Sequence, residues 1–80
     1  MPPRSTTSSY QRDVRRQVGG RLLSLRQLAG LSQETLGAQT GMDRRTIGRI
    51  ERGSVAATLD QLSAIARAIG VPPWRLLRDE

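Results

Sequence analysis

Apolar residues recur at intervals of three or four over residues 11–29, which is the spacing of one face of an α-helix. The residues on that face are Val14, Val18, Leu22, Leu25 and Ala29. Gly19 and Gly20 lie within the segment, and each lowers helix stability by about 1 kcal/mol relative to alanine. The pattern predicts a helix that ends at Gly30, with the part before the two glycines either frayed or belonging to an N-terminal arm.

A pair of short helices joined by a tight turn is predicted in the middle of the chain. Ser32 is a favourable N-cap for a helix over about 33–40, and Gly41 can adopt the left-handed conformation that ends such a helix. Asp43 is a favourable N-cap for a second helix over 44–52. The two helices and their turn therefore occupy about residues 33–52.

The second helix of this pair carries arginines on the face opposite to its apolar residues. Ile47 and Ile50 are three positions apart and mark the buried side. Arg45, Arg49 and Arg52 are spaced i, i+4, i+7 and share the outer side. Cations in a first helical turn oppose the helix dipole by about 0.3–1 kcal/mol, and like charges four positions apart repel each other. A bound polyanion would reverse both effects, which favours a ligand-binding face over a merely solvated one.

Two further elements are predicted after this pair. Thr58 and Gln61 match the capping-box pattern, so a helix should begin at Leu59 and end at Gly70. The residues on its apolar face are Leu59, Leu62, Ile65, Ala66 and Ile69. A proline is tolerated at the first position of a helix, so the Pro-Pro pair after Gly70 predicts a short last helix over 74–77.

The predicted elements describe one compact all-α domain of about five helices. Nothing in the sequence indicates strands, repeats or a second domain. We expect residues 11–80 to form this domain and residues 1–10, which are rich in serine and threonine, to form a flexible N-terminal arm.

Composition restricts the chemistry of the chain. There is no cysteine or histidine, which excludes disulfides and the commonest zinc, haem and iron–sulfur ligand sets, so no metal or cofactor is expected. Without histidine, cysteine or lysine a serine nucleophile lacks its usual base, and the seven acids form no paired pattern, so an enzyme is not expected. The net charge of +6 on 80 residues indicates a polyanionic partner.

The sequence also bears on location. No apolar run approaches the roughly 18 residues of a membrane-spanning helix, and the first residues lack the apolar segment of a secretory signal. No membrane association is therefore expected, and the chain is predicted to be cytoplasmic.

Residues 19–77 resemble the Xre or λ-repressor-like helix-turn-helix domains of bacterial and phage transcription regulators. The resemblance is carried by the segments GLSQETLG, GMD and IGRIERG. It implies a compact five-helix DNA-binding fold with the helix-turn-helix at about 33–52. It further implies a repressor that binds a pseudo-palindromic operator in double-stranded DNA as a homodimer.

The same resemblance implies roles for individual residues. Base edges in the major groove would be contacted by Arg44, Arg45 and Arg49. The DNA phosphates would be contacted by Gln33, Thr46, Arg52, Gly53 and Ser54.

Arg26 and Glu51 match a pair that forms a partly buried salt bridge between the first helix and the recognition helix. The helical wheel supports the Glu51 part of this pair, because Glu51 lies on the same side of its helix as Ile47. A carboxylate on that inner side needs a cationic partner. The alternative is that Glu51 pairs with a neighbouring arginine at the surface.

Other functions fit the same residues. An antitoxin or a restriction-modification controller can use this DNA-binding fold as a small separate chain. A function of a different class is a protein-interaction adaptor that binds another protein through Leu23, Trp74 and the arginine face.

Overall fold

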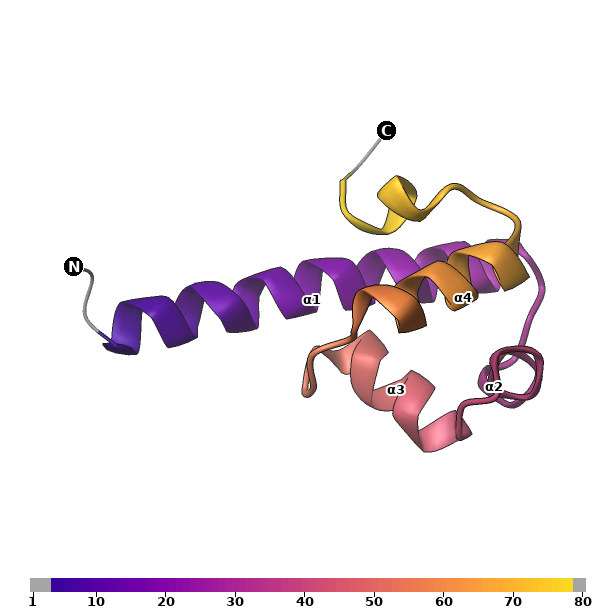
Figure 1. The fold of residues 1–80 in the computed structure, drawn as a ribbon, viewed down its shortest axis with the longest axis horizontal. Coiled ribbons are helices and arrows are strands. Elements are labelled where there is room, and N and C mark those ends of the chain that lie inside the picture. Colours follow the sequence, from indigo (N-terminus) through magenta and orange to yellow (C-terminus); the bar gives the residue numbers. More distant parts are fainter. Residues whose placement is uncertain (1–3, 79–80) are drawn as a thin grey trace.

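The structure is a computed structural model that describes the backbone of residues 4–78 and the side chains of residues 9–78. Over this range the chain forms four α-helices and one 3-10 helix, and it contains no strand (Figure 1). The elements are α1 (Arg4–Leu28), α2 (Gln33–Thr40), α3 (Arg44–Arg52), α4 (Leu59–Ile69) and η1 (Pro73–Leu76). The predicted all-α class is confirmed.

The last element is a 3-10 helix at the place where the sequence predicts a fifth helix over 74–77. The amide of Arg75 donates to the carbonyl of Pro72 at 3.0 Å, and the amide of Leu77 donates to the carbonyl of Trp74 at 2.9 Å. Bonds that span three residues are typical of a 3-10 helix, which is common in pieces as short as this one. The predicted count of five α-helices is therefore not confirmed.

Helix α1 begins at Arg4, well before the predicted start near residue 11. Part of the segment that the sequence assigns to an arm, residues 4–10, is therefore helical, and residues 1–3 lie outside the described part of the chain. The two glycines do not interrupt the helix. Upstream of them, Arg15 donates from Nε to the carbonyl of Gly53 at 3.3 Å, which fastens this part of α1 to the end of α3.

The core lies where α1 crosses α3, and α4 and η1 close it (Figure 1). Helix α2 packs against α3 and α4 at the other end. The buried apolar side chains are Val18, Leu22, Leu25, Leu36, Ile47, Ile50, Leu62, Ile65, Ala66 and Leu76. Most residues of the predicted apolar faces therefore lie in or against the core, but Leu59 is 76% exposed, Val14 is 38% exposed and Ala29 is also exposed.

Two glycines allow close approach of backbones inside this fold. A Cβ atom on Gly19 would overlap the carbonyl oxygen of Ile50 and would lie 2.5 Å from that of Glu51, so α1 and α3 touch through their main chains. A Cβ atom on Gly37 would lie 2.5 Å from the carbonyl oxygen of Met42, so the turn before α3 passes directly over α2. Both crossings fix the position of α3.

Within the described residues, no helix combines the length and the apolar character needed to cross a bilayer. The long helix α1 instead carries charged residues along its length, including Arg12, Asp13, Arg15 and Arg16.

Candidate nucleic-acid interface

Side-chain caps and one glycine set the geometry of the α2–α3 connection. The Ser32 hydroxyl accepts from the Thr35 amide at 3.0 Å, which caps α2. Gly41 has φ +74°, a conformation that other residues avoid, and it ends α2. The Asp43 carboxylate accepts from the Arg45 amide at 2.9 Å and caps α3. Ser32, Gly41 and Asp43 therefore have the capping roles predicted from the sequence. Together they orient α3 against α2.

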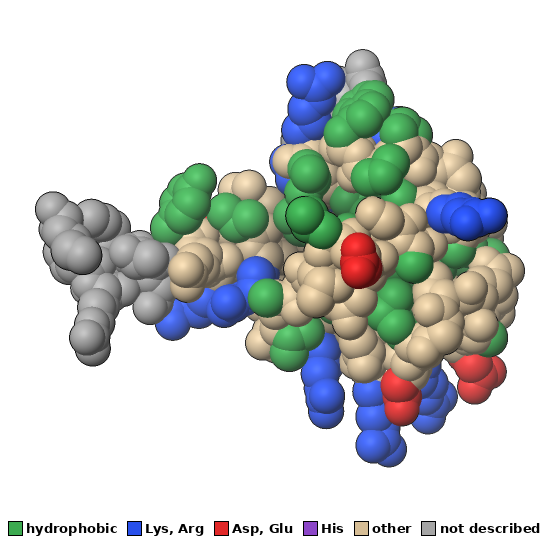
Figure 2. Space-filling model, viewed as in Figure 1, with side chains coloured by type: hydrophobic (Ala, Val, Ile, Leu, Met, Phe, Trp, Pro, Cys, Tyr) green, Lys and Arg blue, Asp and Glu red, His purple; other side chains and the backbone are tan. Residues whose placement is uncertain are grey.

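Helix α3 has one buried and one exposed face. Ile47 and Ile50 are 0% and 2% exposed, whereas all four arginines of the helix are exposed. Figure 2 shows basic side chains projecting from the lower side of the molecule, which is the side where α3 lies in Figure 1. The separation predicted from the spacing of isoleucines and arginines is thus present in the structure.

The outer face of α3 contains a shallow hollow of about 340 Å³ between α3 and the start of α2. It is lined by Gln33, Arg44, Arg45, Gly48, Arg49 and Arg52. The hollow brings together the three residues expected to read bases and two of those expected to contact phosphate. Among the described residues that line it, none is acidic.

Gly48 belongs to this hollow, although the predicted site residues do not include it. A Cβ atom at this position would lie 3.1 Å from Nη1 of Arg52 and 3.5 Å from Nε2 of Gln33. The absence of a side chain at Gly48 therefore leaves room for both the Arg52 guanidinium and the Gln33 amide on this face of α3. A glycine in the middle of a helix, which is unfavourable by about 1 kcal/mol, is the sequence signal that could have identified it.

The other residues expected at phosphates do not line the hollow. Thr46 is half-buried on α3, and Gly53 is buried at the C-terminal cap of the helix, where Arg15 binds its carbonyl. Ser54 is exposed and donates its hydroxyl to the carbonyl of Arg49 at 3.2 Å. These three residues lie on α3 or at its C-terminal end.

A buried ion pair supports α3 from inside. Arg26 of α1 donates to Glu51 of α3 from Nε at 2.5 Å and from Nη2 at 3.1 Å, and the two side chains are 10% and 3% exposed. Arg26 also donates from Nη1 to the carbonyl of Leu31 at 2.8 Å. The alternative, in which Glu51 pairs with an arginine at the surface, does not match this geometry.

Glu51 has a further partner that the sequence does not indicate. Gln33 donates from Nε2 to Oε1 of Glu51 at 2.8 Å. The same carboxylate therefore binds α1 through Arg26 and the first turn of α2 through Gln33. Because Gln33 also lines the hollow, the buried network extends to the edge of the exposed arginine face.

The chemistry of the exposed face suits an anionic ligand. A guanidinium group presents five N–H donors in a planar arrangement that matches phosphate oxygens or the N7 and O6 atoms of guanine. Four such groups on one short helix, with a second helix packed across it, form a surface that can contact a nucleic-acid groove and its flanking phosphates.

Known proteins resemble the chain in both sequence and structure. Residues 22–73 match the HTH_3 family, described as helix-turn-helix. An uncharacterized HTH-type transcriptional regulator, y4dJ of Sinorhizobium fredii (strain NBRC 101917 / NGR234), is 36% identical over 59 residues, which is 74% of this chain and 77% of that protein.

Two solved structures superpose on most of the chain. The restriction-modification controller protein C.AhdI from Aeromonas hydrophila has a TM-score of 0.75 and is 39% identical, covering 78% of this chain and 94% of its own. The hypothetical transcription factor NHTF from Neisseria has a TM-score of 0.78 and is 31% identical, covering 85% of this chain and 78% of its own. The chain therefore belongs to the HTH_3 family of helix-turn-helix proteins, the Xre or λ-repressor-like family that its sequence resembles.

Proposed function

We propose that this chain is a transcription regulator that binds double-stranded DNA in a sequence-specific manner through α3. The observation that carries the proposal is the division of α3 into a buried isoleucine face and an outer face with four exposed arginines around one hollow. Membership of a helix-turn-helix family and the similarity to a transcriptional regulator support it.

In this proposal the residues of the exposed face divide the work of recognition. Arg44, Arg45 and Arg49 contact base edges in the major groove, preferentially N7 and O6 of guanine. The phosphates on either side are held by Gln33, Thr46, Arg52, Gly53 and Ser54. Contacts to phosphate fix the register of the protein on the duplex, and contacts to bases provide specificity.

We further propose that residues 11–80 form the DNA-binding unit and that two copies act together as a repressor on a pseudo-palindromic operator. A two-fold protein dimer matches a two-fold DNA site, and the half-sites would then lie about 34–36 Å apart, one turn of the double helix. In this proposal the protein acts in the cytoplasm. It binds its operator and catalyses no reaction.

The proposal is tested by selecting bound sequences from a random DNA pool and titrating the selected duplex by fluorescence anisotropy. We expect the selected duplex to bind about 10³-fold or more tightly than a random duplex at the same salt concentration. A recovered motif should have two half-sites related by inversion. Equal affinity for the selected and random duplexes would rule out sequence-specific regulation.

Two arginine substitutions should separate the proposed roles. Arg45→Ala should lose about 1–3 kcal/mol of discrimination against the wrong base, because one bidentate contact is removed. Arg52→Ala should weaken binding to all sequences by a similar factor and reduce the slope of log affinity against log salt by about one. The measurement is a set of titrations on matched and mismatched duplexes at several salt concentrations. The reverse pattern would contradict the assignment of these two residues.

One narrower function is compatible with the similarity to a solved structure. The restriction-modification controller C.AhdI is 39% identical, and the superposition covers 94% of its chain. A controller role predicts that the operator lies upstream of genes for a restriction endonuclease and its methyltransferase. Mapping the selected motif onto the DNA that surrounds the gene tests this, and an operator elsewhere would exclude it.

A further inference from the structure

The N-terminal part of α1, residues 4–17, extends beyond the core and carries a row of arginines. Val18 is the first residue of α1 that belongs to the core cluster, and the helix begins well before it. Figure 1 shows this α1 extension, in indigo, running away from the other helices. Among its residues with described side chains, 9–17, the one acid is Asp13 and the basic residues are Arg12, Arg15 and Arg16.

The arginines of the α1 extension lie on the side of the helix that faces α3. The three arginines and Gly19 are spaced i, i+3, i+4 and i+7, which places all four residues on one helical face. At Gly19 that face touches the main chain of α3. The arginines therefore continue the α3-facing side of α1 beyond the point where the two helices cross.

The arginine row meets the proposed DNA-binding face at the C-terminal end of α3. Arg15 donates from Nε to the carbonyl of Gly53 at 3.3 Å. The main chain of Arg16 lies against the same glycine, since a Cβ atom on Gly53 would be 2.8 Å from the Cα of Arg16. Gly53 belongs, with Arg52 and Ser54, to the segment proposed to contact phosphate. A phosphate held at this end of α3 therefore lies next to the α1 extension.

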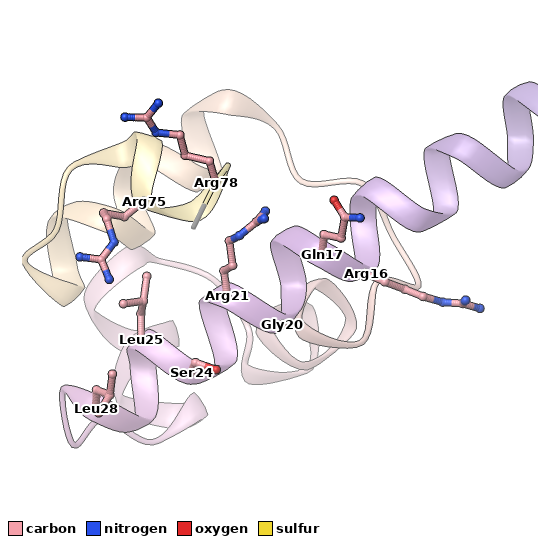
Figure 3. Close-up of a pocket in the computed structure, with 9 residues that line it drawn as sticks. All are labelled: Arg16, Gln17, Gly20, Arg21, Ser24, Leu25, Leu28, Arg75 and Arg78. Carbon is pink, nitrogen blue, oxygen red and sulfur yellow. The ribbon is translucent and has the colours of Figure 1, made fainter. Parts of the chain in front are cut away.

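Two of the three guanidinium groups are available to a ligand. Arg12 and Arg16 are exposed, and no described carboxylate lies within ion-pair distance of either one. Arg12 donates from Nη2 to the hydroxyl of Ser9 at 3.4 Å, a long bond at the surface. In Figure 3 the Arg16 side chain extends away from the groove between α1 and η1, past the edge of the helix. Like charges four positions apart on a helix repel, and a bound anion reverses that repulsion.

The composition of this face indicates which anion fits. Tyr10 and Val14 lie on the opposite side of the helical wheel from the arginines. Figure 2 shows the same separation, with basic side chains below the α1 extension and hydrophobic ones above it. A protein partner would need apolar side chains at the centre of its contact. The arginine side has none among the described residues 9–17, so it matches a sugar-phosphate backbone better than a protein.

The position and spacing of the arginines also fit a duplex. In Figure 2 the basic side chains of the α1 extension project to the same lower side of the molecule as those below α3. A helix rises about 1.5 Å per residue, so Arg12 and Arg16 lie about 6 Å apart along its axis. Phosphates of one DNA strand are spaced about 3.4 Å along the duplex axis, so the two side chains can reach separate phosphates.

We propose that Arg12 and Arg16 bind phosphates of the DNA that flanks the segment contacted by α3. This inference rests on the proposed function and deepens it, because it extends the contact beyond the helix-turn-helix. Arg15 is a positioning residue that holds the α1 extension against the end of α3. Phosphate contacts carry no sequence information, so the α1 extension should raise affinity for every sequence and leave the choice of bases to α3.

The test is a set of anisotropy titrations with the double variant Arg12→Gln/Arg16→Gln. Glutamine keeps the Cγ atom that packs near Gly53 and removes only the charge. The variant should bind the selected and the random duplex about tenfold more weakly than the unchanged chain. The slope of log affinity against log salt should fall by about two for each bound chain.

The matched control is Arg75→Gln/Arg78→Gln, which removes the same charge from η1 and the residues after it. Figure 1 shows η1 on the other side of α1 from α3. This variant should bind both duplexes as tightly as the unchanged chain. Circular dichroism should show that both double variants are as helical as the unchanged chain.

A second readout locates the contact on the DNA. One duplex ends at the outer edges of the selected motif, and another carries about ten further base pairs, one helical turn, at each end. The unchanged chain should bind the longer duplex more tightly. Arg12→Gln/Arg16→Gln should lose most of that difference, whereas the control variant should keep it.

Several results would overturn the inference. Equal losses of affinity in the two double variants would show that only net charge matters. An equal loss on the short and long duplexes would place the contacts within the motif. Weaker discrimination between matched and mismatched duplexes would mean that Arg12 and Arg16 read bases.

Failure of this inference is distinguishable from failure of the proposed function. Full affinity of Arg12→Gln/Arg16→Gln for a tightly bound motif would reject the role of the α1 extension and leave sequence-specific binding by α3 intact. Equal binding of selected and random duplexes by the unchanged chain would reject sequence-specific regulation. The salt titration on the random duplex would then still decide whether Arg12 and Arg16 bind phosphates.

Discussion

Replacing Gly19 with alanine is expected to destabilise the fold by about 3 kcal/mol, at the upper end of the usual range for overpacked sites. The new methyl group would overlap the main-chain carbonyls of Ile50 and Glu51, and backbone atoms cannot rotate away as a side chain can. The α1 and α3 helices would have to separate. Because the free energy of unfolding of a small domain is only about 5–15 kcal/mol, this substitution removes a large part of it.

The neighbouring residue provides the control for this prediction. At Gly20 a Cβ atom would meet nothing within 4 Å, so alanine there should raise stability by about 0.5–1 kcal/mol through its higher helix propensity. Urea denaturation followed by circular dichroism measures both changes. Equal stabilities of Gly19→Ala and Gly20→Ala would contradict the close crossing of the two helices.

Replacing Glu51 with alanine is expected to lower the free energy of unfolding by about 3–5 kcal/mol. The substitution leaves the guanidinium of Arg26 buried without the Glu51 carboxylate that it binds. It also removes the acceptor for the side-chain amide of Gln33. The cost of an unpaired buried charge exceeds that of losing a surface contact. The effect should appear as a lower urea midpoint and as weaker binding to every duplex, because α3 loses its anchor.

Glu34→Ala is the matched control, since it removes an exposed carboxylate from α2 and should change stability by no more than about 0.5 kcal/mol. The double variant Arg26→Met/Glu51→Leu removes both charges together. It should recover much of the loss, because an apolar pair of similar size has no charge to desolvate. A Glu51→Ala variant as stable as Glu34→Ala would contradict the anchoring role.

The parts of the fold that could be predicted are those with local causes. Ser32, Asp43 and the Thr58–Gln61 capping box form the bonds that their residue types favour, because a cap depends only on the few residues around it. The arginine face of α3 follows in the same way from helical spacing. The close contact at Gly37 is local in the same sense, since it is made with the main chain of Met42, only five residues away.

The parts that could not be predicted depend on contacts between residues far apart in the chain. From the sequence alone, Gly19 is only a residue that lowers helix stability. The reason for a glycine at this position is the close contact between the main chains of α1 and α3, which the sequence does not show. The helix also extends through residues 4–10, a segment whose composition is typical of an arm. The bond from Gln33 to Glu51 has no sequence signal, because either side chain could have faced solvent.

The Glu51 network has a consequence for how such a protein could change its target. The side chains that hold α3 in place, Glu51 and the isoleucines, lie on its inner face, and the arginines lie on its outer face. Replacing outer residues therefore leaves the supports of the helix intact. We expect lineages that carry this scaffold to acquire new operators through a few exposed substitutions, so that regulatory circuits diverge while the scaffold persists.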